Sequence, residues 1–162
     1  MKTKIAIIAI IAALVATLTF ANAAEKLKAP NGGRTIDSVT PHAEFLITKD
    51  KKIEIRFLDD AGKVVPPAAQ TITVTMGDRS APTKLVFAQD GDKLVSDKTI
   101  PEGKELPVVV QIKTTPEAKT VSAKFNLNMA KCPTCENPEY ACACAHGAKE
   151  KGHEAHPGHE HK

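Results

Sequence analysis

The fold is decided by the stretch KIEIRF, residues 52–57, in which apolar and charged side chains alternate strictly. The isoleucines and the phenylalanine face one way and the charged residues face the other, which is the pattern of a β-strand with one buried face. A similar apolar stripe runs through residues 43–47, and the sequence KDK at residues 49–51 separates the two stripes. The arrangement predicts a β-hairpin.

Outward from this hairpin, the same alternation recurs between turns rich in Gly, Pro or Asp, such as residues 59–63 and 90–92. The further apolar positions are Ile72, Val74, Met76, Leu85, Phe87, Leu94, Val95, Val108, Val110, Ile112, Val121, Ala123, Phe125 and Leu127. About eight short strands at roughly ten-residue spacing predict an all-β domain over residues 31–128. We expect an antiparallel β-sandwich, Ig-like or related, and a small closed barrel is the alternative.

Composition narrows the function classes. The 162 residues contain no Trp, one Tyr and five Phe, so the core must be mainly aliphatic. An aromatic ligand cage or a base-stacking surface needs several rings and is therefore excluded. The net charge is +3, and it falls to +1 without residues 1–23, which contain two lysines and no acid. Nucleic-acid binding driven by net charge is disfavoured.

Residues 1–23 have the pattern of a signal peptide. Two lysines precede an apolar run that ends at Ala21-Asn22-Ala23, a small-x-small cleavage site. Cleavage after Ala23 predicts an exported protein with no further membrane segment, periplasmic or secreted, whose residues 24–30 link to the β-domain. A bacterial periplasm oxidises thiols, which bears on the cysteines.

The composition changes at Met129. The remaining residues contain all four Cys and five of the six His, and they show no apolar alternation. Such a segment buries too little apolar area to offset its ordering entropy unless a metal or disulfides hold it. We therefore expect a Cys-rich knuckle over residues 129–146 and a disordered His-rich tail over residues 147–162.

The knuckle contains the spacing C-x2-C-x6-C-x-C-x-H, formed by Cys132, Cys135, Cys142, Cys144 and His146. Two residues between thiolates allow both to reach one ion from a tight turn. Zinc takes four such ligands in a tetrahedron, and soft thiolates also suit Cu(I). A zinc or copper ion held by these residues is the first interpretation.

Two other interpretations of the cysteines remain open. An exporting cell can oxidise them to disulfides, and a bridge that crosses the two motifs is more plausible than one within C-x-C. C-x-x-C is also the spacing of thiol–disulfide exchange enzymes, but these place the motif at a helix N-terminus. The pattern before Cys132 predicts strands instead, so catalytic exchange is disfavoured.

Four further histidines, interleaved with Glu, are predicted to contact metal from the flexible tail: His153, His156, His159 and His161. The remaining histidine, His42, falls on the polar side of its predicted strand together with Glu44, and we expect a surface residue rather than a ligand.

The sequence lacks a phosphate-cradling glycine loop, an H-E-x-x-H motif and a G-x-S-x-G elbow. We expect no enzymatic activity and no cofactor-binding site other than metal.

Three segments carry a resemblance: PNGGR at residues 30–34, PHAEF at 41–45 and FLDDAGK at 57–63. Over residues 30–127 the chain resembles small exported β-sandwich proteins of bacteria, mostly uncharacterised, some of which accompany heavy-metal efflux systems. The resemblance implies an exported, metal-linked protein and no specific activity. Copper-carrying periplasmic sandwiches differ, because they place a ligand histidine at the mature N-terminus, where this chain has Ala24-Glu25.

The sequence therefore predicts a periplasmic metal-binding accessory protein that buffers, delivers or confers resistance to zinc or copper. An efflux or transport component of the periplasm is a possible partner. The alternative is a structural or interaction module that binds a partner through a strand edge and has a disulfide-stapled C-terminus.

Overall fold

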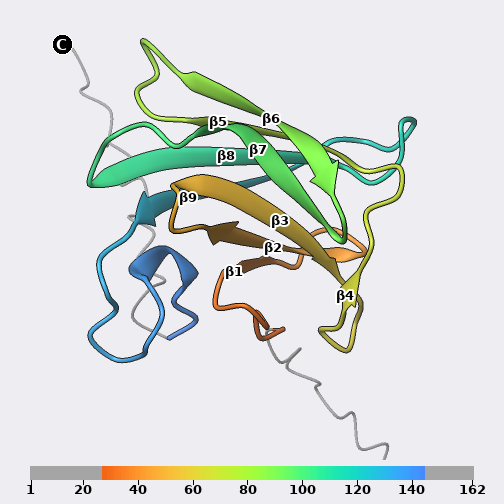
Figure 1. Ribbon diagram of the computed structural model, residues 1–162, viewed down its shortest axis with the longest axis horizontal. Helices are drawn as coiled ribbons and strands as arrows, with labels where there is room; N and C mark the ends of the chain where they lie inside the picture. The colour runs from red at the N-terminus through yellow and green to blue at the C-terminus, as the bar shows by residue number, and fades with distance from the viewer. Residues whose placement is uncertain (1–26, 145–162) are drawn as a thin grey trace, which may run out of the picture.

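The computed structural model describes residues 27–144, and these form an all-β fold with antiparallel pairing throughout (Figure 1). The predicted signal peptide and the predicted His-rich tail lie outside the described residues. No helix between residues 27 and 144 is long and apolar enough to cross a membrane. The elements are β1 Arg34–Ile36, β2 His42–Ile47, β3 Lys52–Leu58, β4 Val64–Val65, β5 Thr71–Met76, β6 Thr83–Asp90, β7 Lys93–Thr99, β8 Glu105–Lys113, β9 Val121–Asn128 and the 3-10 helix η1 Glu139–Ala141.

The alternating stripes form the core as predicted. Ile53, Ile55 and Phe57 of β3 are completely buried. β2 pairs with β3 in the expected hairpin, and Lys51 takes a positive φ of 57° in its turn. Aliphatic side chains of β5 and β8 complete most of the interior, in agreement with a composition poor in aromatic residues. Burial of this apolar surface is the main stabilising contribution.

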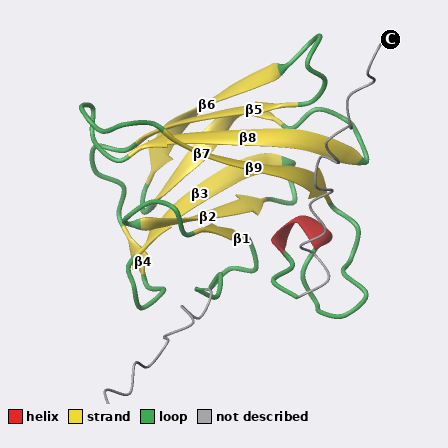
Figure 2. Ribbon diagram, turned by 180° about the vertical axis from the view of Figure 1, so that it is seen from behind, coloured by secondary structure: helices red, strands yellow, loops and turns green. Residues whose placement is uncertain are grey.

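The strands form one continuous path in the order β1-β2-β3-β7-β6-β5-β8-β9, with β4 added to β3. β6 makes the connection, because its first half pairs with β5 and its second half pairs with β7. The sheet curls until it is nearly closed into a barrel (Figure 2). Separate sandwich sheets are not confirmed, and the alternative of a small barrel is closer. Alternation shows which side chains face inward, but not which strand edges pair.

The two edge strands of the path, β1 and β9, do not pair with each other in the described sheet, and we call the region between them the seam. Side chains bridge the seam: the Phe45 and Phe125 rings meet edge to face with centroids 5.2 Å apart. The guanidinium of Arg34, on β1, lies 4.7 Å from the centroid of the Phe125 ring, on β9. Such cation–π and aromatic contacts stabilise without strand hydrogen bonds.

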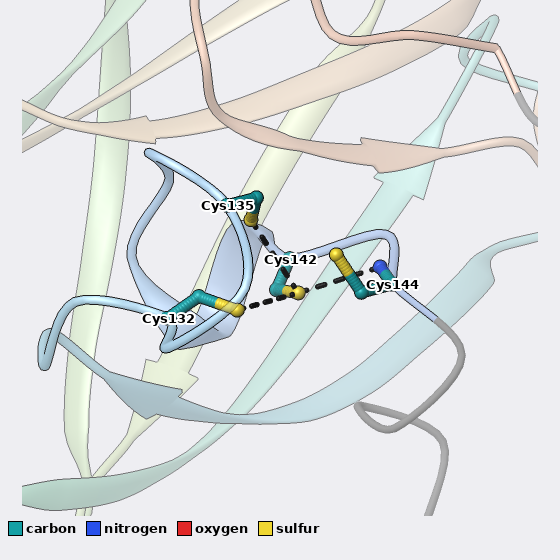
Figure 3. A group of neighbouring side chains, drawn as sticks. All are labelled: Cys132, Cys135, Cys142 and Cys144. Carbon is teal, nitrogen blue, oxygen red and sulfur yellow. Dashed lines mark hydrogen bonds between the residues drawn. The ribbon is translucent and has the colours of Figure 1, made fainter.

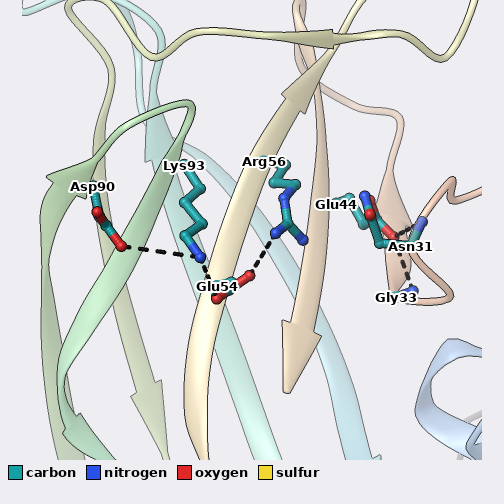
Figure 4. A network of polar contacts seen from close by, with 7 residues as sticks. All are labelled: Asn31, Gly33, Glu44, Glu54, Arg56, Asp90 and Lys93. Carbon is teal, nitrogen blue, oxygen red and sulfur yellow. Dashed lines mark hydrogen bonds and ion pairs between the residues drawn. The ribbon is translucent and has the colours of Figure 1, made fainter. Parts of the chain in front are cut away.

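Glu44 departs from its prediction. It lies on the polar side of β2 as expected, yet it is completely buried, because the N-terminal turn at residues 31–33 covers it. Its carboxylate accepts hydrogen bonds from the backbone N–H of Asn31 (2.9 Å), the Asn31 side-chain amide (2.8 Å) and the backbone N–H of Gly33 (2.9 Å; Figure 4). These three donors replace the water that a buried carboxylate loses.

The carboxylate of Glu54, on the polar side of β3, is paired with cations instead. It lies 2.8 Å from the Arg56 guanidinium and 2.7 Å from the Lys93 ammonium of β7 (Figure 4). His42 lies close to the turn after β3, with its Nε2 atom 3.4 Å from Asp60 Oδ1. Its Nδ1 atom is buried without a hydrogen-bond partner among the described residues. His42 is half-buried on this strand.

Candidate metal centre

Residues 129–144, which we call the cysteine loop, follow β9 and fold back on themselves. Lys131 and Pro138 form an isolated antiparallel bridge. The backbone N–H of Cys132 donates to the Asn137 carbonyl at 3.0 Å, and that of Glu139 donates to the Ala130 carbonyl at 2.9 Å. These bonds close a short turn that presents Cys132 and Cys135 on one side.

The helix η1 then places the C-x-C motif, Cys142 and Cys144, next to the C-x-x-C motif. The backbone N–H of Ala141 donates to the Pro138 carbonyl at 2.9 Å, and that of Cys142 donates to the Glu139 carbonyl at 3.1 Å. One helical turn is too short for a stable helix on its own. It is long enough to bring Cys142 beside the cysteines that precede it by seven and ten residues.

The four cysteines converge. The Sγ atoms of Cys132, Cys135, Cys142 and Cys144 all lie within 4.8 Å of one another (Figure 3). Cys142 Sγ is 3.2 Å from Cys132 Sγ and 3.7 Å from Cys135 Sγ. An ion bound at about 2.3 Å by four tetrahedral sulfurs separates them by about 3.8 Å. The donor set therefore has the number, chemistry and approximate spacing that a metal ion requires.

Backbone amides support two of the sulfurs. The N–H of Thr134 points at Cys132 Sγ with an N···S distance of 3.5 Å, and the N–H of Cys144 points at Cys142 Sγ at 3.3 Å. In both cases the amide lies two residues after the cysteine, so the same local turn occurs at both motifs. Amide donors stabilise the charged form of a sulfur, which is the form that binds metal.

Without an ion, two of the thiols, those of Cys135 and Cys142, resist ionisation. The hydrogen bond between the Cys132 and Cys142 side chains is the main cause that raises the pKa of Cys142, to about 12, and burial adds to it. The pKa of Cys135 is also raised: an amide hydrogen bond from Asn137 opposes the shift, but desolvation and the thiols of Cys132 and Cys144 outweigh it. Several negative charges cannot share so small a volume unless a cation compensates them. Metal binding here must release protons.

The cysteine loop is docked on the barrel by Tyr140. This side chain is 2% exposed and belongs to the hydrophobic core. Its ring meets Phe45 edge to face with centroids 6.0 Å apart, and its hydroxyl accepts a hydrogen bond from the backbone N–H of Ile47 at 3.1 Å. Burial raises the pKa of Tyr140, and the nearby carboxylate of Glu44 adds to the shift.

Further contacts join the loop to both edges of the seam. Arg34 Nη1 of β1 donates to the Tyr140 carbonyl at 3.1 Å. Asn128 of β9 donates from its side-chain amide to the Glu139 carboxylate at 3.0 Å. The helix η1 thus lies against β1 and β9 together. Sequence reasoning missed Tyr140, although it is the only tyrosine of the chain and lies between the two cysteine motifs.

The structure brings together four of the predicted ligands. Cys132 is 3% exposed, and the other three cysteines are half-buried. No other group of three or more His, Cys, Asp or Glu within residues 27–144 is placed to hold an ion. The remaining predicted ligands lie outside the described residues: His146, His153, His156, His159 and His161.

Comparison with protein-family models finds no matching family, and comparisons with curated proteins and with solved structures find no match. The cysteine geometry is therefore the basis for assigning a function.

Proposed function

We propose that this protein is an exported metal-binding accessory protein that holds one zinc or copper ion on Cys132, Cys135, Cys142 and Cys144. One observation carries the proposal: all four Sγ atoms lie within 4.8 Å of one another. The chain contains four cysteines, and all four belong to this cluster. Four sulfurs in one place form a ligand set for soft or borderline cations.

Zinc fits the cluster better than copper. Four donors complete a tetrahedral zinc shell, and the 3.7 Å separation of Cys135 and Cys142 Sγ is close to its edge of about 3.8 Å. Cu(I) also binds thiolates, so the two ions are distinguished by stoichiometry and competition. His146 and the histidines of the tail would then receive or pass on further ions.

The exposure of the cluster supports buffering or delivery. Cys135, Cys142 and Cys144 are half-buried, whereas a sealed structural site would bury all its ligands. An incoming ligand can therefore approach from the solvent side while Cys132, at 3% exposure, anchors the ion from within. The partner proposed for this exchange is a periplasmic efflux or transport component.

Native mass spectrometry of the full chain expressed for export, and purified without metal-chelating resin, tests the proposal. We expect cleavage after Ala23 and one zinc or copper ion per chain. The double variant C135S/C144S is expected to lose the ion. Glu136→Gln is the matched control, because it changes an exposed carboxylate of the same loop that pairs with Lys131. Four titratable thiols with no bound ion, and no uptake of added zinc, would reject the function.

A second candidate is a structural or interaction module with a disulfide-stapled loop. The observation in its favour is the 3.2 Å separation of Cys132 and Cys142 Sγ, the shortest of the sulfur distances given above. This pair crosses the two motifs, as expected for a bridge. Intact mass distinguishes the candidates, since two bridges remove four hydrogens and leave no ion.

Catalytic thiol–disulfide exchange receives less support. Exchange enzymes lower the pKa of the attacking thiol, whereas the pKa of Cys135 and that of Cys142 are both raised. Cys132, the other member of the C-x-x-C motif, is buried. In an insulin-reduction assay we expect no difference between the wild-type protein and Cys132→Ser.

A further inference from the structure

The cysteine motifs flank Tyr140, the residue that docks the cysteine loop on the barrel. Cys132 and Cys135 precede Tyr140, and Cys142 and Cys144 follow it, so an ion held by all four closes a chain loop around Tyr140. Closing that loop restricts the positions available to the segment between the motifs. The ligands of the ion and the contact with the barrel are thus parts of one short segment.

That contact lies at the two open ends of the strand path. β1 and β9 are the two ends of the strand path and do not pair with each other in the described sheet. Tyr140 joins these ends through its neighbours: its carbonyl accepts a hydrogen bond from Arg34 of β1, and its ring and hydroxyl contact Phe45 and Ile47 of the adjacent strand β2. The helix η1 also lies against β9. Edge strands leave backbone groups unpaired, so such ends are the first to open unless they are covered.

We propose that the bound ion is a clamp on the seam: metal binding holds η1 between β1 and β9, and loss of the ion releases it and opens the barrel there. This inference rests on the proposed function, because it requires that the cluster bind metal. The ion then has a regulatory role as well as being cargo, because the seam is closed when the ion is bound and open when it is lost.

Thermodynamic linkage sharpens the inference. If the ion stabilises the docked loop, the docked loop must raise the affinity for the ion by the same factor. A loop that binds metal independently would do so equally well with the seam open, and the barrel would not respond. Removing Tyr140 while keeping all four cysteines separates the two cases.

The test uses the reduced full chain with Co²⁺ as the probe. Thiolate-to-cobalt absorption reports binding, and amide hydrogen exchange of peptides covering β1, β2 and β9 reports the seam. In the wild-type protein we expect cobalt to slow exchange at β1 and β9. In Tyr140→Ala we expect the absorption to persist with about 10-fold weaker affinity, and exchange at β1 and β9 to be fast with or without cobalt.

Two further variants control for misfolding. Tyr140→Phe keeps the ring on Phe45 and loses only the hydroxyl contact with Ile47, so it should fold and show a reduced response. Val86→Ala changes an exposed side chain of β6 and should respond as the wild type does. Cobalt absorption with unchanged exchange at β1 and β9 would overturn the clamp alone. A wild-type protein without cobalt absorption would overturn both the clamp and the proposed function.

Discussion

The substitution Glu44→Gln removes one charge from the interior of the fold while leaving the side-chain size unchanged. The carboxylate is completely buried and accepts hydrogen bonds from three donors, which belong to Asn31 and Gly33. Hydrogen bonds to a charged acceptor contribute about 1.5–3 kcal/mol each, against about 0.5–1.5 for neutral ones. The glutamine amide also places a donor against a donor at one of the three positions. We therefore expect a loss of roughly 3 kcal/mol in the free energy of unfolding.

Urea denaturation of the wild-type and variant proteins, followed by far-ultraviolet circular dichroism, measures this loss as a lower midpoint with an unchanged slope. Glu102→Gln is the control, because its side chain is 88% exposed and pairs with the exposed Lys51. Surface pairs of this kind contribute little, so its midpoint should stay near that of the wild type. Equal midpoints for Glu44→Gln and Glu102→Gln would refute the assignment of Glu44 as a buried anchor of the N-terminal turn.

Three further outcomes are expected. Gly33→Ala should lower the unfolding midpoint strongly, because its new Cβ would lie 2.5 Å from the Phe45 carbonyl oxygen, and a midpoint like that of the wild type would contradict the close approach. The contribution of Tyr140 to stability should be fully present below about pH 10 and lost as the pH rises through its raised pKa, which a pH series of thermal melts checks against Tyr140→Phe. Metal affinity should increase from pH 6 to pH 8, because Cys142 must lose a proton whose pKa is about 12 without an ion, and a flat cobalt titration would exclude thiolate ligands.

The strands and the cysteine cluster could be predicted from the sequence for the same reason: both depend on the spacing of residues that are close together in the chain. The stripe ending at Phe57 and the turn at residues 49–51 depend on neighbours in the chain, as does the reach of Cys132 to Cys135. The convergence of the two cysteine motifs depends in addition on the path of the chain between them. Only six residues separate Cys135 from Cys142, so few paths keep the motifs apart.

The closure of the sheet and the docking of the cysteine loop could not be predicted in this way. β6 divides its hydrogen bonds between β5 and β7, which no alternation of side chains encodes. Glu44 has the sequence signature of an exposed strand residue, and its burial depends on a turn that precedes it by eleven residues or more. Tyr140 contacts Ile47 across 93 positions of the chain. Such pairings are set by the tertiary structure.

The hydrogen bonds of Tyr140 with Ile47 and Arg34 span 93 and 106 residues. Contacts so distant in sequence require the closure of a long loop, which costs conformational entropy before the contacts become favourable. A ribosome releases the N-terminal strands long before it releases the tyrosine that covers them. A product truncated after Asn128 would therefore keep both ends of its sheet bare and would tend to aggregate, so a segment synthesised after all the strands protects the first of them.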